Sequence, residues 1–246
     1  QVALLGRNLE KLKKVESEIN NSYTLSISTD VTSQEQVEAA REKVMDKFGS
    51  CDILINGAGG NQPEAVTTVS EFDERELKDS EEVRGFFNLS MDTFNNVIEA
   101  NTMGTVIPCY VFGNDMADKK SGTIINIASM NSFRPLSRVG AYGMAKAGIM
   151  NFTQWFAAYI APANIRVNAI APGFFPNERS RKILMKPDGG YTERGANIIS
   201  QTPMKKFGEP SELIGCMNWL INDEAAGFVT GVTIPIDGGF LANAGI

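Results

Sequence analysis

Two residues suited to proton transfer, Tyr142 and Lys146, lie four positions apart in an apolar stretch of this chain. An α-helix has 3.6 residues per turn, so the phenol and the ammonium group of such a pair share one helix face. A nearby cation favours the phenolate, and bringing a tyrosine pKa from ~10 to about 7 requires roughly 4 kcal/mol of differential stabilisation. The same spacing also arises by chance, so the surrounding sequence decides what the pair means.

Two polar residues upstream supply that context. Ser129 follows the buried-strand pattern of residues 124–128, and a hydroxyl at the carboxyl end of a strand can donate to a developing alkoxide. Asn101 lies inside a helical pattern, where asparagine is unfavourable without a local reason, such as shaping a water relay to the lysine. With Tyr142 and Lys146, these side chains form a candidate proton path.

Composition narrows the possible functions. The chain has 246 residues, 43% of them hydrophobic and 21% charged, and it contains no histidine. A Ser-His-Asp triad and a His-based zinc site are therefore excluded, and we expect no metal. The net charge of −6 argues against nucleic acid as a partner, and no apolar run reaches the ~18 residues typical of a membrane span. Three widely spaced cysteines fit reduced thiols in a cytoplasmic protein.

The elements that position these residues alternate between strand-like apolar runs and helical patterns, which predicts a parallel sheet covered on both faces. We expect one domain over residues 1–246, with a Rossmann-like doubly wound sheet in three α/β/α layers. The expected strands are Val2–Leu5, Tyr23–Ser28, Ile53–Asn56, Gly122–Ile127, Ile165–Ile170 and Val232–Ile236. The expected helices are Leu9–Asn20, Gln34–Phe48, Met91–Asp118, Ala141–Ile160 and Pro210–Ile221.

Local signals mark the helix starts and two interruptions of the pattern. Asn8 and Ser33 are expected helix caps, and Gln36 is placed to complete a capping box with Ser33. Residues 60–90 are polar and acidic, and residues 174–209 are rich in Pro, Gly, Lys and Arg. Both stretches follow strand carboxyl ends, where ligands bind in open α/β sheets, so we expect substrate-side loops. Solvated surface insertions are the alternative, and the acidic run favours it for residues 71–76.

In order and spacing, these motifs resemble the short-chain dehydrogenase/reductase family over nearly the whole chain. The Asn-Ser-Tyr-Lys tetrad of that family matches Asn101, Ser129, Tyr142 and Lys146. The further matching motifs are Asn56-Gly57-Ala58-Gly59, Asp30-Val31, Pro172-Gly173 and the closing segment from Gly231 to Asp237-Gly238-Gly239.

The resemblance implies a nicotinamide-dependent oxidoreductase that interconverts a secondary alcohol and a ketone by hydride transfer. It makes Tyr142 the catalytic acid/base and Ser129 the residue that orients the substrate carbonyl. Lys146 would bind the nicotinamide ribose and depress the Tyr142 pKa, while Asn101 would hold a relay water. The cofactor-binding positions that it implies are Arg7, Asn8, Asp30, Val31, Asn56, Gly57, Ala58, Gly59, Tyr142, Lys146, Pro172, Gly173, Phe175 and Asn177.

Three departures from the family pattern concern the cofactor. The phosphate-cradling loop Thr-Gly-x-x-x-Gly-x-Gly and the strand before it are absent, so we expect about 30 further residues upstream. Gly6 stands where NAD-preferring members carry an acid, and Arg7 could pair with a 2′-phosphate. We therefore expect NADP or NAD, with NADP favoured, although Arg7 could also be a plain surface charge. Asn177 stands where a threonine usually meets the carboxamide, and its amide can make similar hydrogen bonds.

Within the family, the chain resembles the bacterial D-mannonate oxidoreductase (fructuronate reductase) branch in residues 59–63, 129–133, 171–175 and 202–204. This implies a sugar acid as the small-molecule substrate, with D-mannonate and D-fructuronate as the pair. Amide groups suit its hydroxyls and arginine forks suit its carboxylate. The expected substrate-binding residues are Asn61, Gln62, Ser129, Asn131 and Arg134, with Arg138, Arg179 and Arg181 as further candidates for the carboxylate.

Alternatives to this substrate and to catalysis remain open. Another carbonyl compound, such as 5-ketogluconate or a 3-oxoacyl group, could enter a pocket lined by Met130, Phe133, Phe174 and Phe175. The chain could also be a dinucleotide-binding regulatory protein without turnover, although the tetrad argues against this. The resemblance further implies a homotetramer whose interface helices lie in residues 91–118 and 141–160.

Overall fold

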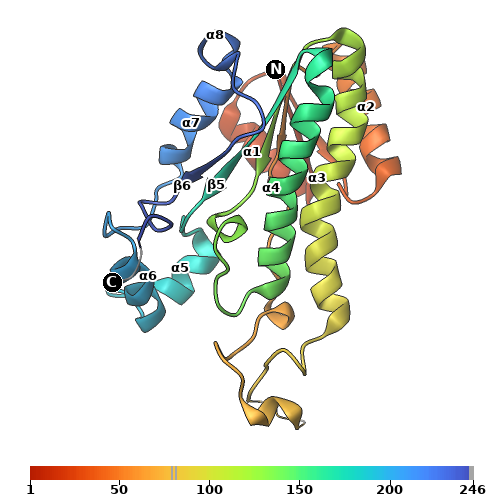
Figure 1. Cartoon of the computed structure of the whole chain (residues 1–246). Coiled ribbons are helices and arrows are strands. Elements are labelled where there is room, and N and C mark those ends of the chain that lie inside the picture. The colour runs from red at the N-terminus through yellow and green to blue at the C-terminus, as the bar shows by residue number, and fades with distance from the viewer. Residues whose placement is uncertain (79, 81, 244–246) are drawn as a thin grey trace.

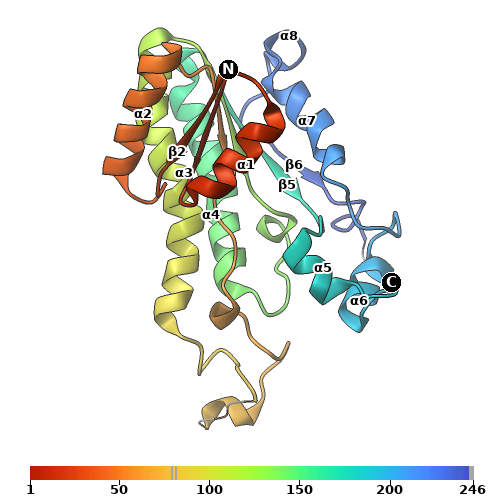
Figure 2. The same ribbon diagram turned by 180° about the vertical axis from the view of Figure 1, so that it is seen from behind.

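The computed structural model of the chain describes residues 1–78, 80 and 82–243 (Figure 1). Its paired strands are parallel and form two sheets, one with the order β1-β2 and the other with the order β3-β4-β5-β6. The carboxyl ends of the strands in both sheets point to the side of the molecule where α5 and α6 lie (Figures 1 and 2). The strands are β1 (Val2–Gly6), β2 (Thr24–Ser28), β3 (Ile53–Asn56), β4 (Gly122–Ile127), β5 (Ile165–Pro172) and β6 (Thr233–Ile236).

Helices cover both faces of the sheets, which confirms the predicted Rossmann-like three-layer architecture. The helices α2, α3 and α4 lie on one face, and α1 and α7 lie on the other (Figures 1 and 2). The α-helices are α1 (Leu9–Ile19), α2 (Gln34–Phe48), α3 (Met91–Lys119), α4 (Gly140–Ile160), α5 (Glu178–Leu184), α6 (Glu193–Gln201), α7 (Ser211–Ile221) and α8 (Asp223–Ala226). In the described part of the chain, no helix has both the length and the hydropathy needed to cross a membrane.

The hydrophobic core follows from the position of β4 and β5 inside the larger sheet. A strand buried on both faces has no polar alternation, and β5 is buried from Ile165 to Ala171. Ile124 and Ile125 of β4 are fully buried, and Met116 of α3 packs over the sheet. Burial of such side chains stabilises the fold by ~1.5–3 kcal/mol each. The core thus holds rigid the two strands whose carboxyl ends lead into the candidate site.

The predicted caps of the first two helices are confirmed, with one correction. The side chains of Asn8 and Ser33 accept hydrogen bonds from Lys11 N and Gln36 N. The predicted capping box at Ser33 is wrong, because the Gln36 side chain accepts from Asp30 N and not from Ser33 N. Gln36 therefore ties the first turn of α2 to the start of the loop that follows β2.

The segment expected as a loop over residues 174–209 contains two helices. Asn177 caps α5, accepting a hydrogen bond from Ser180 N, and Thr192 caps α6 by accepting one from Gly195 N. These caps satisfy the first backbone N–H groups of each helix. The segment is therefore an ordered part of the wall beside β5 and β6.

The described residues between 60 and 90 extend away from the sheets, below the start of α3 (Figure 1). Two 3-10 turns, Pro63–Ala65 and Glu74–Leu77, lie within the segment. The acidic run is not simply solvated, because the Glu76 side chain is only 4% exposed. Its carboxylate accepts hydrogen bonds from Asp73 N and Phe87 N. Glu76 thus fastens the two halves of this extension to each other.

Candidate active site

Ser129, Tyr142 and Lys146 come together at the carboxyl end of β4. Ser129 follows β4, and the other two residues lie in the first two turns of α4. The Lys146 Nζ atom lies 5.6 Å from the centre of the Tyr142 ring. A hydrogen bond joins the side chains of Ser129 and Tyr142. A serine hydroxyl, a phenol and an amine therefore meet at the edge of the sheet where ligands bind in this class of fold.

Lys146 is fixed from both ends. Its Nζ donates a hydrogen bond of 2.7 Å to the Ile127 carbonyl oxygen, and its backbone oxygen accepts one of 2.6 Å from Ser132 Oγ. The residue is 4% exposed. Burial lowers the pKa of Lys146 from 10.5 to about 8, because removal from water disfavours the charged form.

The pKa of Tyr142 moves opposite to the direction expected from the Tyr-Lys spacing. Burial raises it above its ordinary value of 10.0, and the hydrogen bond with Ser129 offsets part of that rise. Lys146 directs its Nζ to Ile127 O rather than to the phenol oxygen. In the chain itself, Tyr142 is therefore held as a neutral phenol, the form that can donate a proton.

Asn101 is completely buried and bonds to the turn after β3. Its Nδ2 donates to the carbonyl oxygens of Gly60 and Val97, both at 2.7 Å, and its Oδ1 accepts from Gly60 N at 3.1 Å. Gly59 has a φ of 137°, and a Cβ there would lie 2.3 Å from Asn101 Oδ1. The unfavourable asparagine inside α3 thus has a local reason. All of these bonds go to Gly60 and Val97, and none reaches Lys146.

The expected adenine-side residues lie at the ends of β1 and β2. Asn8 is occupied as the cap of α1, whereas Arg7 is exposed. The Asp30 carboxylate accepts hydrogen bonds from the hydroxyl and the backbone N–H of Thr32, and these bonds lower its pKa. Val31 packs close to Gly104 of α3. Asp30 is consequently a preformed, charged acceptor at this edge.

In the turn after β3, the backbone is accessible to a ligand, whereas the Asn56 side chain is not. Asn56 is buried, and its Nδ2 donates to Asn126 Oδ1 at 2.9 Å. Asn126 donates in turn to Thr153 Oγ1, so a polar ladder runs from β3 through β4 to α4. Hydrophobic periodicity gave no signal for this ladder. Gly57, Ala58 and Gly59 are exposed, so their backbone is available to a ligand.

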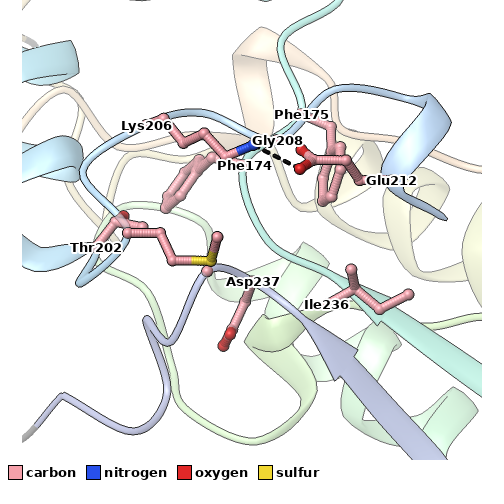
Figure 3. Close-up of a pocket in the computed structure, with 10 residues that line it drawn as sticks. Phe174, Phe175, Thr202, Lys206, Gly208, Glu212, Ile236 and Asp237 are labelled. Atoms are coloured by element: carbon pink, nitrogen blue, oxygen red, sulfur yellow. Dashed lines mark hydrogen bonds and ion pairs between the residues drawn. The ribbon is translucent and has the colours of Figure 1, made fainter.

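A cavity of about 80 Å³ lies beyond β5 and β6, and its lining includes Phe175 but not Asn177, the residue expected at the carboxamide (Figure 3). Phe174 and Phe175 line it, and Lys206 pairs with Glu212 at its rim. After Pro172, Gly173 runs so close to β6 that a Cβ there would lie 2.7 Å from Asp237 Cα. Asn177 is exposed and caps α5.

The expected substrate-binding residues Asn131 and Asn61 differ in burial and in the hydrogen bonds that they already make. Asn131 is buried, with Oδ1 accepting from Leu136 N at 2.8 Å, while Nδ2 has no hydrogen-bond partner among the residues that the structure describes. A second cavity, of about 260 Å³, adjoins Asn131 and the first turns of α4. Asn61 Oδ1 accepts from Gln62 N, a local turn bond. These contacts leave the Asn131 amide with an unused donor near Ser129.

The candidate arginines differ in what already binds them. Arg134 Nη1 donates to the Asn243 carbonyl oxygen at 3.2 Å, and Arg181 lies 3.8 Å from a Glu209 carboxylate oxygen. Arg138 Nε donates to Thr67 O at 2.9 Å, and this is the only side-chain hydrogen bond that Arg138 makes with the described residues. The side chain of Arg179 lies outside the described structure.

Comparison with known proteins identifies relatives over the full length of the chain. The family profile described as "Enoyl-(Acyl carrier protein) reductase" matches residues 1–241. An uncharacterized oxidoreductase of Haemophilus influenzae is 44% identical over 247 residues, covering 100% of this chain and 86% of the relative. Uncharacterized oxidoreductase UxuB of Bacillus subtilis is 41% identical over 248 residues, covering 100% of this chain and 87% of the relative.

A solved structure agrees with these matches. The crystal structure of a Haemophilus protein with bound NAD, provisionally identified as a D-mannonate oxidoreductase, superposes with a TM-score of 0.92 at 42% identity. The alignment covers 99% of this chain and 87% of that protein. Fold, sequence and the cluster of Ser129, Tyr142 and Lys146 agree: the chain belongs to the short-chain dehydrogenase/reductase family of NAD(P)-dependent oxidoreductases.

Proposed function

We propose that this protein interconverts D-mannonate and D-fructuronate, moving a hydride between the substrate carbon and a nicotinamide cofactor. The observation that carries the proposal is the likeness, at 42% identity and a TM-score of 0.92, to the Haemophilus protein provisionally identified as a D-mannonate oxidoreductase. An unused donor near the tetrad supports a polyol substrate, since the buried Nδ2 of Asn131 lacks a partner in the described part of the chain. Burying a hydroxyl beside such a donor recovers a hydrogen bond that the chain alone leaves unmade.

The residues at the edge of the sheet suit a nicotinamide dinucleotide. Asp30 is a charged acceptor for the adenosine end, and the exposed backbone of residues 57–59 allows close approach of the ligand. Lys146 and Tyr142 would meet the nicotinamide ribose, and Phe175 and Asn177 the carboxamide. When bound, the cofactor supplies or accepts the hydride, and the protein contributes orientation and electrostatics.

Proton transfer in this proposal belongs to Tyr142. During ketone reduction the phenol donates its proton to the carbonyl oxygen as the carbon receives the hydride, so the product is a neutral alcohol. Ser129 donates a hydrogen bond to the same oxygen and stabilises its developing negative charge. Lys146 favours the resulting phenolate, because its cation lies over the Tyr142 ring. In alcohol oxidation each transfer runs in reverse.

Two observations bear on the choice of cofactor. Arg7 is exposed at the end of β1 and has no ion pair among the described residues, which supports a 2′-phosphate and hence NADP. The NAD bound to the similar Haemophilus protein supports NAD. We propose that the enzyme accepts both and prefers NADP, so both coenzymes belong in the assay.

Steady-state turnover tests the function. Wild type is expected to oxidise NADPH or NADH in the presence of D-fructuronate, faster than with tagaturonate or 5-ketogluconate. Tyr142→Phe should lower kcat by about 10²- to 10⁴-fold, since general acid catalysis contributes that much, and retain coenzyme binding. Equal rates for the two proteins would contradict the role of Tyr142. Coenzyme binding without turnover of any carbonyl would favour a regulatory protein.

Two further properties complete the proposal. We place the protein in the cytoplasm, because Cys51, Cys109 and Cys216 are all free thiols. We also propose that it is a homotetramer built as a single domain per chain. The exposed aromatic side chains of α4 support association, since Trp155 is 57% and Tyr159 69% exposed.

A further inference from the structure

Asn131 has a buried donor that the protein itself leaves unused. The residue is 4% exposed, and its Oδ1 accepts a hydrogen bond from Leu136 N at 2.8 Å. Its Nδ2 has no hydrogen-bond partner among the residues that the structure describes. A buried polar group without a partner destabilises a folded protein, so its presence calls for an explanation. A ligand that accepts a hydrogen bond from Nδ2 would supply the missing partner.

The Asn131 amide lies at the wall of a cavity of about 260 Å³. One water molecule takes up ~30 Å³ in the liquid, so the cavity has room for a larger group. On the side of α4, its lining includes Gly140 and Gly143, which contribute only backbone because they have no side chain. A Cβ at Gly143 would lie 3.2 Å from Asn131 Nδ2, so the amide packs directly against the first turns of the helix. The unused donor and the start of α4 therefore belong to one cavity.

The start of α4 adds further donors to this cavity. The first N–H groups of a helix have no partner inside the helix, and a polar side chain often caps them. In α4 the cap position is held by Val139, which makes no such bond. The helix is 21 residues long, and its macrodipole favours a negative charge at this end. Among the described residues that line the cavity none is acidic, so no carboxylate of the wall repels an anion there.

Hydrogen bonds join the cavity wall to the cluster of Ser129, Tyr142 and Lys146. Asn131 N donates to Ser129 Oγ at 3.1 Å, and Ser132 Oγ donates to Lys146 O at 2.6 Å. Tyr142 directly precedes a glycine of the cavity wall on α4. Each residue of the cluster is thus bonded to, or next in sequence to, a residue that lines the cavity. The cavity therefore lies beside the groups that would handle the substrate carbonyl.

We propose that this cavity binds the carboxylate of the substrate, with Asn131 Nδ2 and the first N–H groups of α4 as donors. This inference rests on the proposed function. A carboxylate only accepts hydrogen bonds, which matches these donors. A hydroxyl could also accept from Nδ2, but its own proton would then face the apolar side chains of Phe133, Leu136 and Met144. The cavity thus selects a sugar acid over the corresponding neutral sugar.

The replacement of Asn131 by aspartate tests the proposal with little change in side-chain shape. Asn131→Asp keeps an oxygen for Leu136 N and puts a second oxygen in place of Nδ2. We expect KM for D-fructuronate to rise by about tenfold to hundredfold, the range for a lost charge-assisted hydrogen bond. KM for D-fructose, in which a CH₂OH group replaces the carboxylate, should stay as in wild type. Asn21→Asp is the matched control, since Asn21 is exposed and its Oδ1 likewise accepts from a backbone N–H, that of Tyr23.

The outcomes separate this site from the proposed function. An unchanged KM for D-fructuronate, or equal losses on D-fructuronate and D-fructose, would overturn the carboxylate site. A rise in KM for the coenzyme alone would assign the cavity to the coenzyme and also overturn it. If wild type reduces 5-ketogluconate but not D-fructuronate, the proposed function fails, and 5-ketogluconate against L-sorbose repeats the comparison.

A binding measurement on the wild-type protein keeps the test open if Asn131→Asp does not fold. Saturation-transfer NMR with D-mannonate and with D-mannitol compares the acid and the neutral polyol without turnover. We expect a signal from D-mannonate that exceeds the signal from D-mannitol at the same concentration. Equal signals from the two compounds would contradict the proposal.

Discussion

At the scale of single residues, the site depends on groups whose charge is suppressed by burial. Tyr142 stays neutral because its phenolate would be poorly solvated, and Lys146 loses its proton more readily for the same reason. The pKa of the tyrosine rises and the pKa of the lysine falls, and both shifts favour the neutral form of the side chain. Below about pH 8 a neutral phenol therefore lies beside a charged amine, and this combination suits ketone reduction.

Lys146 also makes a prediction about stability. Its pKa in the folded protein is about 8, below the ordinary 10.5, so between these values the unfolded chain binds more protons and stability rises with pH. Below pH 8 the buried charge costs roughly 3 kcal/mol. We expect Lys146→Met to unfold at a higher urea concentration than wild type at pH 7. This difference between the two midpoints should be smaller at pH 10.

Urea titrations at pH 7, 9 and 10 measure this difference in the free energy of unfolding. Lys14→Met is the matched control, because Lys14 is exposed on α1 and its replacement should give a difference independent of pH. If the difference in the free energy of unfolding between Lys146→Met and wild type stays constant over the same pH range, the prediction is refuted.

At the scale of elements, the turn after β3 is locked to α3 through Asn101. Gly59 and Gly60 have φ values of 137° and 146°, so an alanine at either position is strained. Only at Gly59 would the new Cβ also meet Asn101 Oδ1, whereas Gly60 has open space around it. We expect Gly59→Ala to lower the free energy of unfolding by about 1 kcal/mol or more beyond Gly60→Ala. Thermal unfolding and turnover of the two variants measure it, and equal stability would mean that Asn101 moves aside freely.

Sequence patterns identified the regular elements well and their special contacts poorly. The runs of β-branched residues in β4 and β5 have few interpretations, so those strands were predicted within two residues. The helices α5 and α6 were missed because each is short and polar, and their capping residues Asn177 and Thr192 were the only usable signals.

The residue types of the candidate site were likewise predictable from the sequence, whereas its contacts between distant segments were not. Tyr142, Lys146 and Ser129 follow from strand ends and helix spacing, which fix direction and register. The ladder of Asn56, Asn126 and Thr153 was not predictable, because it joins segments that are distant in sequence. The direction of the Tyr142 pKa was also missed, since burial is a property of the packed molecule.

At the scale of the whole molecule, α4 carries an aromatic ladder that runs from rings packed against the core to the exposed rings of Trp155 and Tyr159. Phe152 stacks on Phe156 at 5.4 Å between ring centres, and Trp155 stacks on Tyr159 at 5.3 Å. An exposed apolar patch of this kind typically marks a site of association. We expect wild type to have the mass of a tetramer and Trp155→Glu to have a smaller mass with an unchanged fold.

Multi-angle light scattering at micromolar concentration measures both masses. The control is Lys14→Glu, since Lys14 is exposed on α1 and its replacement should leave the mass as in wild type. A wild-type monomer would contradict the proposal, as would a Trp155→Glu protein that stays tetrameric.

The helix α4 holds Tyr142 and Lys146 in its first two turns and the aromatic ladder in its last three. If neighbouring copies clamp that ladder, the orientation of the phenol is set partly from outside the chain. Specific activity should then fall on dilution below the dissociation constant of the assembly, and substrate or coenzyme should restore it by favouring the assembled state. Enzyme kept at low concentration would lose rate without any change in its covalent structure.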